Sequence, residues 1–175
     1  MLLLLVVVVG GVAYSMRRLW TRAPGAALLA QGRAAYVAGD RDGARRAFVR
    51  ATAEFPSLAE PHVYLGRMAR EEGRRGEASE ELRRAVELEP GNFLTHRELA
   101  AFLLATGQPE LARAFYQRAI ELNPADPPSL GFMGCALARS GRPDLAPRFL
   151  SRAGEGPWSA CAAGAAANAP APAVP

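Results

Sequence analysis

The sequence predicts an all-α protein, a solenoid of about four helix-turn-helix repeats that is preceded by a single hydrophobic helix. The composition is the first observation. Half of the 175 residues are apolar but only 7% are aromatic, and the abundant Ala, Leu and Arg are good helix formers. The second observation is a set of residues that recur at a spacing of 34. The third is an apolar run at the start of the chain.

The apolar run, residues 1–16, contains no charged side chain. A helix of this length reaches roughly 24 Å, and flanking residues can extend it toward the roughly 30 Å of a bilayer's hydrocarbon core. We therefore predict a transmembrane or signal-anchor helix over residues 1–20 and a juxtamembrane linker over residues 21–24. Two alternatives stay open: an anchor truncated at its N-terminus, and a cleaved signal peptide, which would need a basic region before the run.

The charges beside this run predict its orientation. Arg17, Arg18 and Arg22 follow the run, and no basic side chain precedes it. The positive-inside rule then places the rest of the chain in the cytoplasm. We expect a single-pass membrane protein with cytoplasmic repeats, while residues missing upstream would allow the periplasmic side instead.

The repeats follow from four residue series that share the period of 34 at fixed phase. Such a period is the sequence signature of stacked repeat units. The units are residues 25–58, 59–92, 93–126 and 127–156, and an Ala/Pro-rich flexible tail follows over residues 157–175, with Trp158 as a cap on the last unit. The series are Gly39, Gly73, Gly107 and Gly141; Pro56, Pro90 and Pro124; Ala44, Ala78, Ala112 and Ala146; and Ala51, Ala85, Ala119 and Ala153.

Each unit is predicted to contain two helices joined by a short turn. In the second unit, apolar residues recur at helical spacing over residues 60–72 and again over residues 77–88. Pro90 ends the second of these helices, because proline lacks a backbone donor and cannot continue a helix. In the last unit Pro147 falls inside the second helix at a cost of about 3 kcal/mol, so we expect that helix to be kinked or frayed.

This pattern of small and large residues resembles the tetratricopeptide repeat family. Leu65 and Gly66 match the paired positions of helix one in that family, and a bulky residue follows four positions after the small residue that opens helix two. The bulky series is Phe48, Leu82, Tyr116 and Leu150. The resemblance covers residues 25 to about 156, and it implies a right-handed solenoid whose concave groove is lined by the first helix of each unit.

The resemblance also implies that this groove binds a peptide or protein segment. Arg side chains would hold carboxylates or backbone carbonyls, and aromatic side chains would provide anchors. The predicted peptide-binding residues are Arg33, Tyr36, Tyr64, Arg67, Arg70, Leu94, Arg97, Leu104, Phe132 and Arg139.

An alternative interpretation is that the groove arginines only form ion pairs on a solvated surface. The pairs would join Arg33, Arg67 and Arg97 to Glu60, Glu71 and Glu98. Some family members clamp a C-terminal carboxylate with Lys and Asn, and the corresponding positions here hold neither residue, so no such clamp is expected.

The net charge of +4 does not indicate a nucleic-acid-binding domain, although the pI is near 9.7. Residues 1–39 contain four Arg and no acidic residue, whereas residues 40–175 contain 17 Arg and 17 acidic residues. Most of the excess is therefore a cluster beside the apolar run, and no nucleic-acid partner is expected.

The sequence contains no motif for catalysis, phosphate binding or dinucleotide binding, so we expect no enzyme activity, no cofactor and no small-molecule substrate. Cys135 and Cys161 are interpreted as two unrelated thiols, and His62 and His96 as packing residues rather than a metal site. We predict a monomeric, membrane-tethered scaffold or adaptor that binds a peptide or protein. Two alternatives remain: an assembly factor for the envelope or for cytochrome c maturation, with its repeats outside the cytoplasm, and a fragment of a larger enzyme truncated at its N-terminus.

Overall fold

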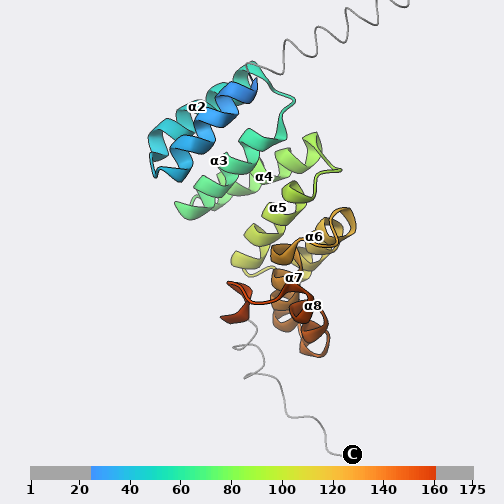
Figure 1. Cartoon of the computed structure of the whole chain (residues 1–175). Helices are drawn as coiled ribbons and strands as arrows, with labels where there is room; N and C mark the ends of the chain where they lie inside the picture. Colours follow the sequence, from blue (N-terminus) through green and yellow to red (C-terminus); the bar gives the residue numbers. More distant parts are fainter. Residues whose placement is uncertain (1–24, 161–175) are drawn as a thin grey trace, which may run out of the picture.

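The computed structural model describes residues 25–160, and every regular element within them is helical. Residues 25–37 belong to the first helix. The elements that follow are α2 (Arg41–Glu54), α3 (Ala59–Glu71), α4 (Arg75–Leu88), α5 (Phe93–Ala105), α6 (Pro109–Leu122), α7 (Pro127–Arg139), the 3₁₀ helix η1 (Pro143–Leu145) and α8 (Ala146–Ala153), as Figure 1 shows.

The predictions for residues 1–24 and 161–175 lie outside the described residues. The membrane anchor predicted over residues 1–20 is one of them. Between residues 25 and 160, none of the helices combines the length and apolarity that a bilayer crossing requires.

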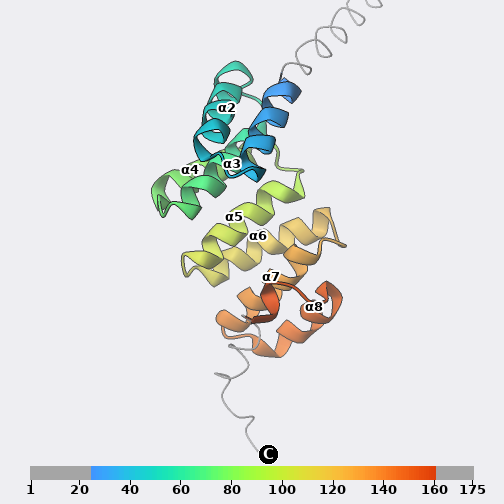
Figure 2. The same cartoon turned by 60° about the vertical axis from the view of Figure 1, so that its left-hand side comes forward.

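The helices form stacked pairs, which Figures 1 and 2 show from two sides. α3 packs on α4, α5 on α6 and α7 on α8, while α4–α5 and α6–α7 contacts join successive pairs. The first helices of successive pairs also touch, α3 with α5 and α5 with α7. The predicted all-helical solenoid is thereby confirmed. In the second unit the helices begin at Ala59 and Arg75, slightly earlier than predicted.

Close contact between the two helices of a unit explains the small residues of the repeat. A Cβ placed on Gly66 would lie only 2.6 Å from Leu82 Cγ. Leu82 is 1% exposed, and Ala78 and Ala85 in the same helix are completely buried. The bulky side chain therefore fills the space that glycine leaves, and its burial contributes about 1.5–3 kcal/mol.

The turn between the two helices of a unit requires a left-handed backbone conformation. Gly73 has a φ of +76°, and its equivalents Gly39, Gly107 and Gly141 have φ values of +79°, +79° and +76°. Residues with a Cβ are strained in this region, whereas glycine is not. The recurring glycine thus meets a requirement of the backbone.

Replacing Gly73 with Ala is expected to lower the free energy of unfolding by about 1–2 kcal/mol, because an L-residue is strained at this φ. A steric clash adds nothing, since no atom lies within 4 Å of a Cβ built there. Gly76→Ala is the matched control: Gly76 lies within α4 and its Cβ also meets open space. This control is expected to raise the free energy of unfolding by about 0.5–1 kcal/mol. Urea denaturation measures both changes, and equal effects of the same sign would contradict this account.

The second helix of the last unit accommodates Pro147 without an internal kink. The chain first forms η1, and α8 then begins at Ala146. Pro147 consequently lies in the first turn of α8, where a backbone N–H has no partner within the helix and its loss costs little. The prediction of a kinked or frayed helix is therefore wrong: α8 is a shorter helix that is preceded by the 3₁₀ helix η1.

Trp158 covers the first helix of the last unit, in agreement with its predicted role as a cap. Its side chain is 6% exposed. It packs directly against Gly131, and its ring meets that of Phe132 edge to face at 5.8 Å between centroids. Its indole Nε1 donates a hydrogen bond to the carbonyl oxygen of Gly154 at 2.8 Å. The chain therefore returns onto α7 after α8.

Cys135 lies under this cap. It is completely buried, its Sγ is 3.3 Å from the carbonyl oxygen of Trp158, and it is disulfide-bonded. The interpretation of the cysteines as two unrelated thiols is therefore wrong. The other cysteine of the sequence, Cys161, lies outside the described residues. The spacing of the cysteines along the chain did not indicate the disulfide bond of Cys135, because only the return of the chain onto α7 places the cap over this residue.

Candidate functional site: a pocket across three repeats

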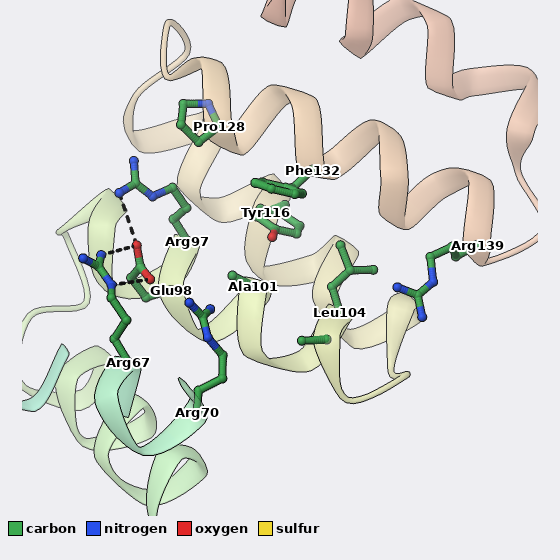
Figure 3. A pocket seen from close by; sticks show the side chains of 11 residues that line it. Arg67, Arg70, Arg97, Glu98, Ala101, Leu104, Tyr116, Pro128, Phe132 and Arg139 are labelled. Atoms are coloured by element: carbon green, nitrogen blue, oxygen red, sulfur yellow. Dashed lines mark hydrogen bonds and ion pairs between the residues drawn. The ribbon is translucent and has the colours of Figure 1, made fainter. Parts of the chain in front are cut away.

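A pocket of about 450 Å³ opens across the first helices of three successive units. Its residues come from α3, α5 and α7, with one side chain from α6 below them (Figure 3). The lining residues are Arg67, Arg70, Arg97, Glu98, Ala101, Leu104, Ala105, Tyr116, Pro128, Phe132 and Arg139. Four arginines and one glutamate thus surround a floor of Ala, Leu and aromatic side chains.

One wall of the pocket is a network of ion pairs centred on Glu98. Arg67 donates two hydrogen bonds to the Glu98 carboxylate, at 2.6 and 3.2 Å. Arg97 donates to Glu98 at 3.2 Å and to Asp126 at 3.0 Å, and Figure 3 shows the contacts with Glu98 as dashed lines. Asp126 also accepts a hydrogen bond from the Ser129 backbone N–H at the start of α7. The network therefore connects α3, α5 and α7.

The electrostatics of this wall favour charged Glu98. Burial alone would raise its pKa, but the positive charge and hydrogen bonds of Arg67 outweigh burial, so the pKa lies below the ordinary value of a glutamate. The charges of Arg67 and Arg97 are correspondingly engaged by acidic neighbours. For these two residues the structure therefore shows the ion pairs that the alternative interpretation of the groove arginines predicted. Arg97 pairs with Asp126 in addition to Glu98.

The other two arginines of the pocket are of a different kind. Arg70 in α3 is half-buried and Arg139 in α7 is exposed. Within residues 25–160, neither guanidinium forms a hydrogen bond or ion pair. Figure 3 shows Leu104 between the two, at the floor of the pocket. The pocket therefore offers two available cations beside an apolar surface.

Tyr116 lies below this apolar surface and stacks on Phe132, with 6.4 Å between ring centroids. Its side chain is completely buried, and among the described residues its hydroxyl has no hydrogen-bond partner. Burial, together with the negative charge of Glu98, raises the pKa of Tyr116, so the hydroxyl stays protonated. The repeat pattern in the sequence indicates only a packing role for Tyr116 in helix two. Its polar tip, unique among the four bulky residues of that series, was the available signal.

The other predicted groove residues lie outside this pocket. Tyr64 and Leu94 line a neighbouring pocket of about 230 Å³, which shares Arg67 and Arg97 with the larger one. In the first unit, Arg33 pairs with Glu60 at 2.7 Å, and the Tyr36 hydroxyl donates to Glu71 at 2.6 Å. The ten predicted residues therefore divide into six that meet in the large pocket, two beside it and two in ion-paired or hydrogen-bonded positions of the first unit.

The two histidines do not approach a common ligand position. His62 lies 2.7 Å from Glu81 through Nδ1, and His96 Nε2 lies 2.9 Å from the Pro90 carbonyl oxygen. In the part of the chain that the structure describes, no group of three or more His, Cys, Asp or Glu side chains is arranged to hold a metal ion. These contacts give each ring a local partner.

The stacked helix pairs and the pocket on their first helices define a helical-repeat protein with a groove. Two models of the tetratricopeptide repeat match residues 29–92 and 69–134. The two matches overlap and together extend over more than half of the chain. The chain belongs to the tetratricopeptide repeat family.

Solved structures with the same fold include a Thermobaculum terrenum O-GlcNAc transferase mutant, at 33% identity and a TM-score of 0.63, over 67% of this chain and 23% of the transferase. This chain thus spans about a quarter of that enzyme. A thermophilic TPR protein of Thermus thermophilus matches at 25% identity and a TM-score of 0.65, over 74% of this chain and 72% of the other. YrrB, described as a TPR protein with an unusual peptide-binding site, matches at 22% identity and a TM-score of 0.62, over 72% and 65%. No curated protein sequence matches the chain.

Proposed function

We propose that this chain is a non-catalytic scaffold that binds a segment of a partner protein across α3, α5 and α7. The observation that carries the proposal is the pocket of about 450 Å³, in which apolar floor and available arginines come from three successive units. A site built from several units suits an extended or helical segment better than a compact substrate, because it offers anchors along a line. A peptide-binding site on a protein of similar fold, YrrB, supports the same use of the repeats.

The pocket does not bear on membrane tethering, and it does not distinguish the alternative functions predicted from the sequence. The membrane tether over residues 1–20, and with it the side of the membrane on which the repeats lie, stays a prediction from the sequence. An envelope assembly factor would use the same groove, so the pocket supports both forms of the scaffold. The likeness to the transferase covers 23% of that enzyme, and its activity is not carried over to this chain.

Filling the pocket is the direct test of the proposed function. Ala105 is an exposed lining residue at the end of α5, so Ala105→Trp blocks the pocket without removing a core contact. Ala114 is an exposed residue of α6 outside the pocket, and Ala114→Trp is the matched control. We expect partner proteins retained by the full chain in a pull-down to be lost with Ala105→Trp and kept with Ala114→Trp. Partner sets that do not differ between the chain and Ala105→Trp would overturn the proposal.

A further inference from the structure

We propose that the segment bound in this pocket is acidic and apolar: it places a carboxylate between Arg70 and Arg139 and an aliphatic or aromatic side chain on the floor formed by Leu104 and Phe132. This inference rests on the proposed function and names the chemistry of the partner. It comes from the division of the four pocket arginines into two kinds, which the sequence does not reveal.

Charge complementarity favours an acidic partner segment. Arg67 and Arg97 are already neutralised, because Glu98 and Asp126 accept their hydrogen bonds. Arg70 and Arg139 keep their charge available within the described part of the protein, and they come from different units. A guanidinium binds a carboxylate with two parallel hydrogen bonds where the geometry allows, so an acidic side chain is the group that suits this part of the pocket.

An apolar surface lies between the two cations (Figure 3). Leu104, Ala101 and Phe132 give the pocket an apolar floor, and Phe132 is only half-buried. An apolar side chain that covers this floor removes it from water and gains about 25 cal/mol per Å² of buried area. The same floor lowers the local dielectric and strengthens the neighbouring ion pairs. Acidic and apolar residues close together in the partner therefore match the pocket better than either kind alone.

The Tyr116 hydroxyl offers the segment a further hydrogen bond. It is a buried donor without an acceptor in the described residues, a condition that costs about 1–3 kcal/mol. Figure 3 shows its oxygen on the side of the ring that faces Ala101, away from Phe132. Arg70 and Glu98 both act electrostatically on this hydroxyl. An acceptor oxygen of the partner that reaches the pocket floor beside Arg70 would satisfy it.

The charges of this chain favour a segment from a partner protein. Residues 1–24 and 161–175, the two ranges outside the described part, contain neither Asp nor Glu. Their side chains therefore offer no carboxylate to Arg70 and Arg139. An acidic segment of a partner protein has the complementary charge, and the proposal commits to that occupant.

The test is a selection from a phage-displayed library of random peptides on the full chain, with counter-selection on Ala105→Trp. We expect the selected peptides to combine Asp or Glu with Leu, Ile, Phe or Trp. In fluorescence anisotropy with a selected peptide, Arg70→Gln together with Arg139→Gln should weaken binding by about tenfold or more. Tyr116→Phe, which removes only the hydroxyl, should weaken it by about threefold to tenfold.

The matched control removes the same charge elsewhere. Arg46 and Arg148 are exposed residues of α2 and α8 outside the pocket, and Arg46→Gln with Arg148→Gln should leave affinity unchanged. Selected peptides that are neutral or basic, or that bind the Arg70 and Arg139 double variant as well as the control, would overturn this inference and leave the proposed function intact. A selection that enriches no pocket-dependent peptide would overturn both. Self-association that the double variant abolishes, seen by sedimentation, would make a second copy the occupant and reject the foreign partner.

Discussion

Replacing Leu82 with Ala is expected to lower the free energy of unfolding by about 2–5 kcal/mol, the range for truncating a fully buried leucine. Leu82 is 1% exposed and fills the space above Gly66, so the surrounding helices cannot close the cavity without moving their backbones. Leu82 lies in the second unit, and it belongs to a hydrophobic cluster that also contains residues of the third unit. Because neighbouring repeats stabilise one another, the loss should reach beyond α3 and α4.

Leu111→Ala makes the same chemical change on the surface and is the control for this prediction. Leu111 lies in α6 and is 52% exposed. Its truncation should change the free energy of unfolding by no more than about 0.5 kcal/mol. Equilibrium urea denaturation of the two variants gives both values. Similar losses for the two variants would show that Leu82 does not fill the space between the helices of its unit.

Replacing Glu98 with Gln is expected to lower the free energy of unfolding at neutral pH by about 2–3 kcal/mol. The Glu98 side chain is 9% exposed. The substitution removes its negative charge, so Arg67 and Arg97 lose the carboxylate that they share. Breaking a fully buried pair costs about 3–5 kcal/mol. The two arginine side chains retain 24% and 19% exposure, so water compensates part of this loss.

The contribution of Glu98 should depend on pH in a defined direction. Its pKa in the folded chain is below that of an unfolded glutamate, so the stabilisation is present above about pH 4.3 and is lost as the pH falls through the folded-state pKa. The difference between the wild-type chain and Glu98→Gln should therefore be largest near neutrality and shrink in acid. Glu87→Gln, at an exposed Arg84–Glu87 pair, should show no comparable difference at any pH. The free energies of unfolding of the wild-type chain and of Glu98→Gln could instead differ by a constant amount down to about pH 3, well below the ordinary glutamate pKa. That result would contradict a lowered pKa for Glu98 in the folded chain.

The fold was largely predictable because its determinants are local. Gly73 marks a turn with positive φ, Gly66 and Leu82 mark the contact of two helices, and Pro90 marks the end of a unit. Each of these requirements involves residues within one unit of 34 and recurs in the next. A repeated local requirement leaves a period in the sequence, so helix pairs and their stacking could be inferred without any long-range information.

The site was predictable only as a face of the molecule. The repeat pattern assigns Arg67, Arg70, Arg97 and Arg139 to the same concave face, but spacing does not reveal which guanidinium is paired. That depends on Glu98, which approaches Arg67 from the next unit, and on Asp126 at the start of α7, which approaches Arg97. The burial of Tyr116 depends on its contact with Phe132 of the next unit, and the cap formed by Trp158 depends on the return of the chain onto α7.

The sequence by itself determined the repeat length, the helix pairs and the family of this protein, because local backbone and packing requirements recur along the chain. Only the tertiary structure decided that Arg67 and Arg97 belong to an ion-pair network whereas Arg70 and Arg139 remain available beside Leu104. The physical reason is that ion pairing and burial depend on distances between side chains of different units. Those distances are set when the units stack, and a period in the sequence does not contain them.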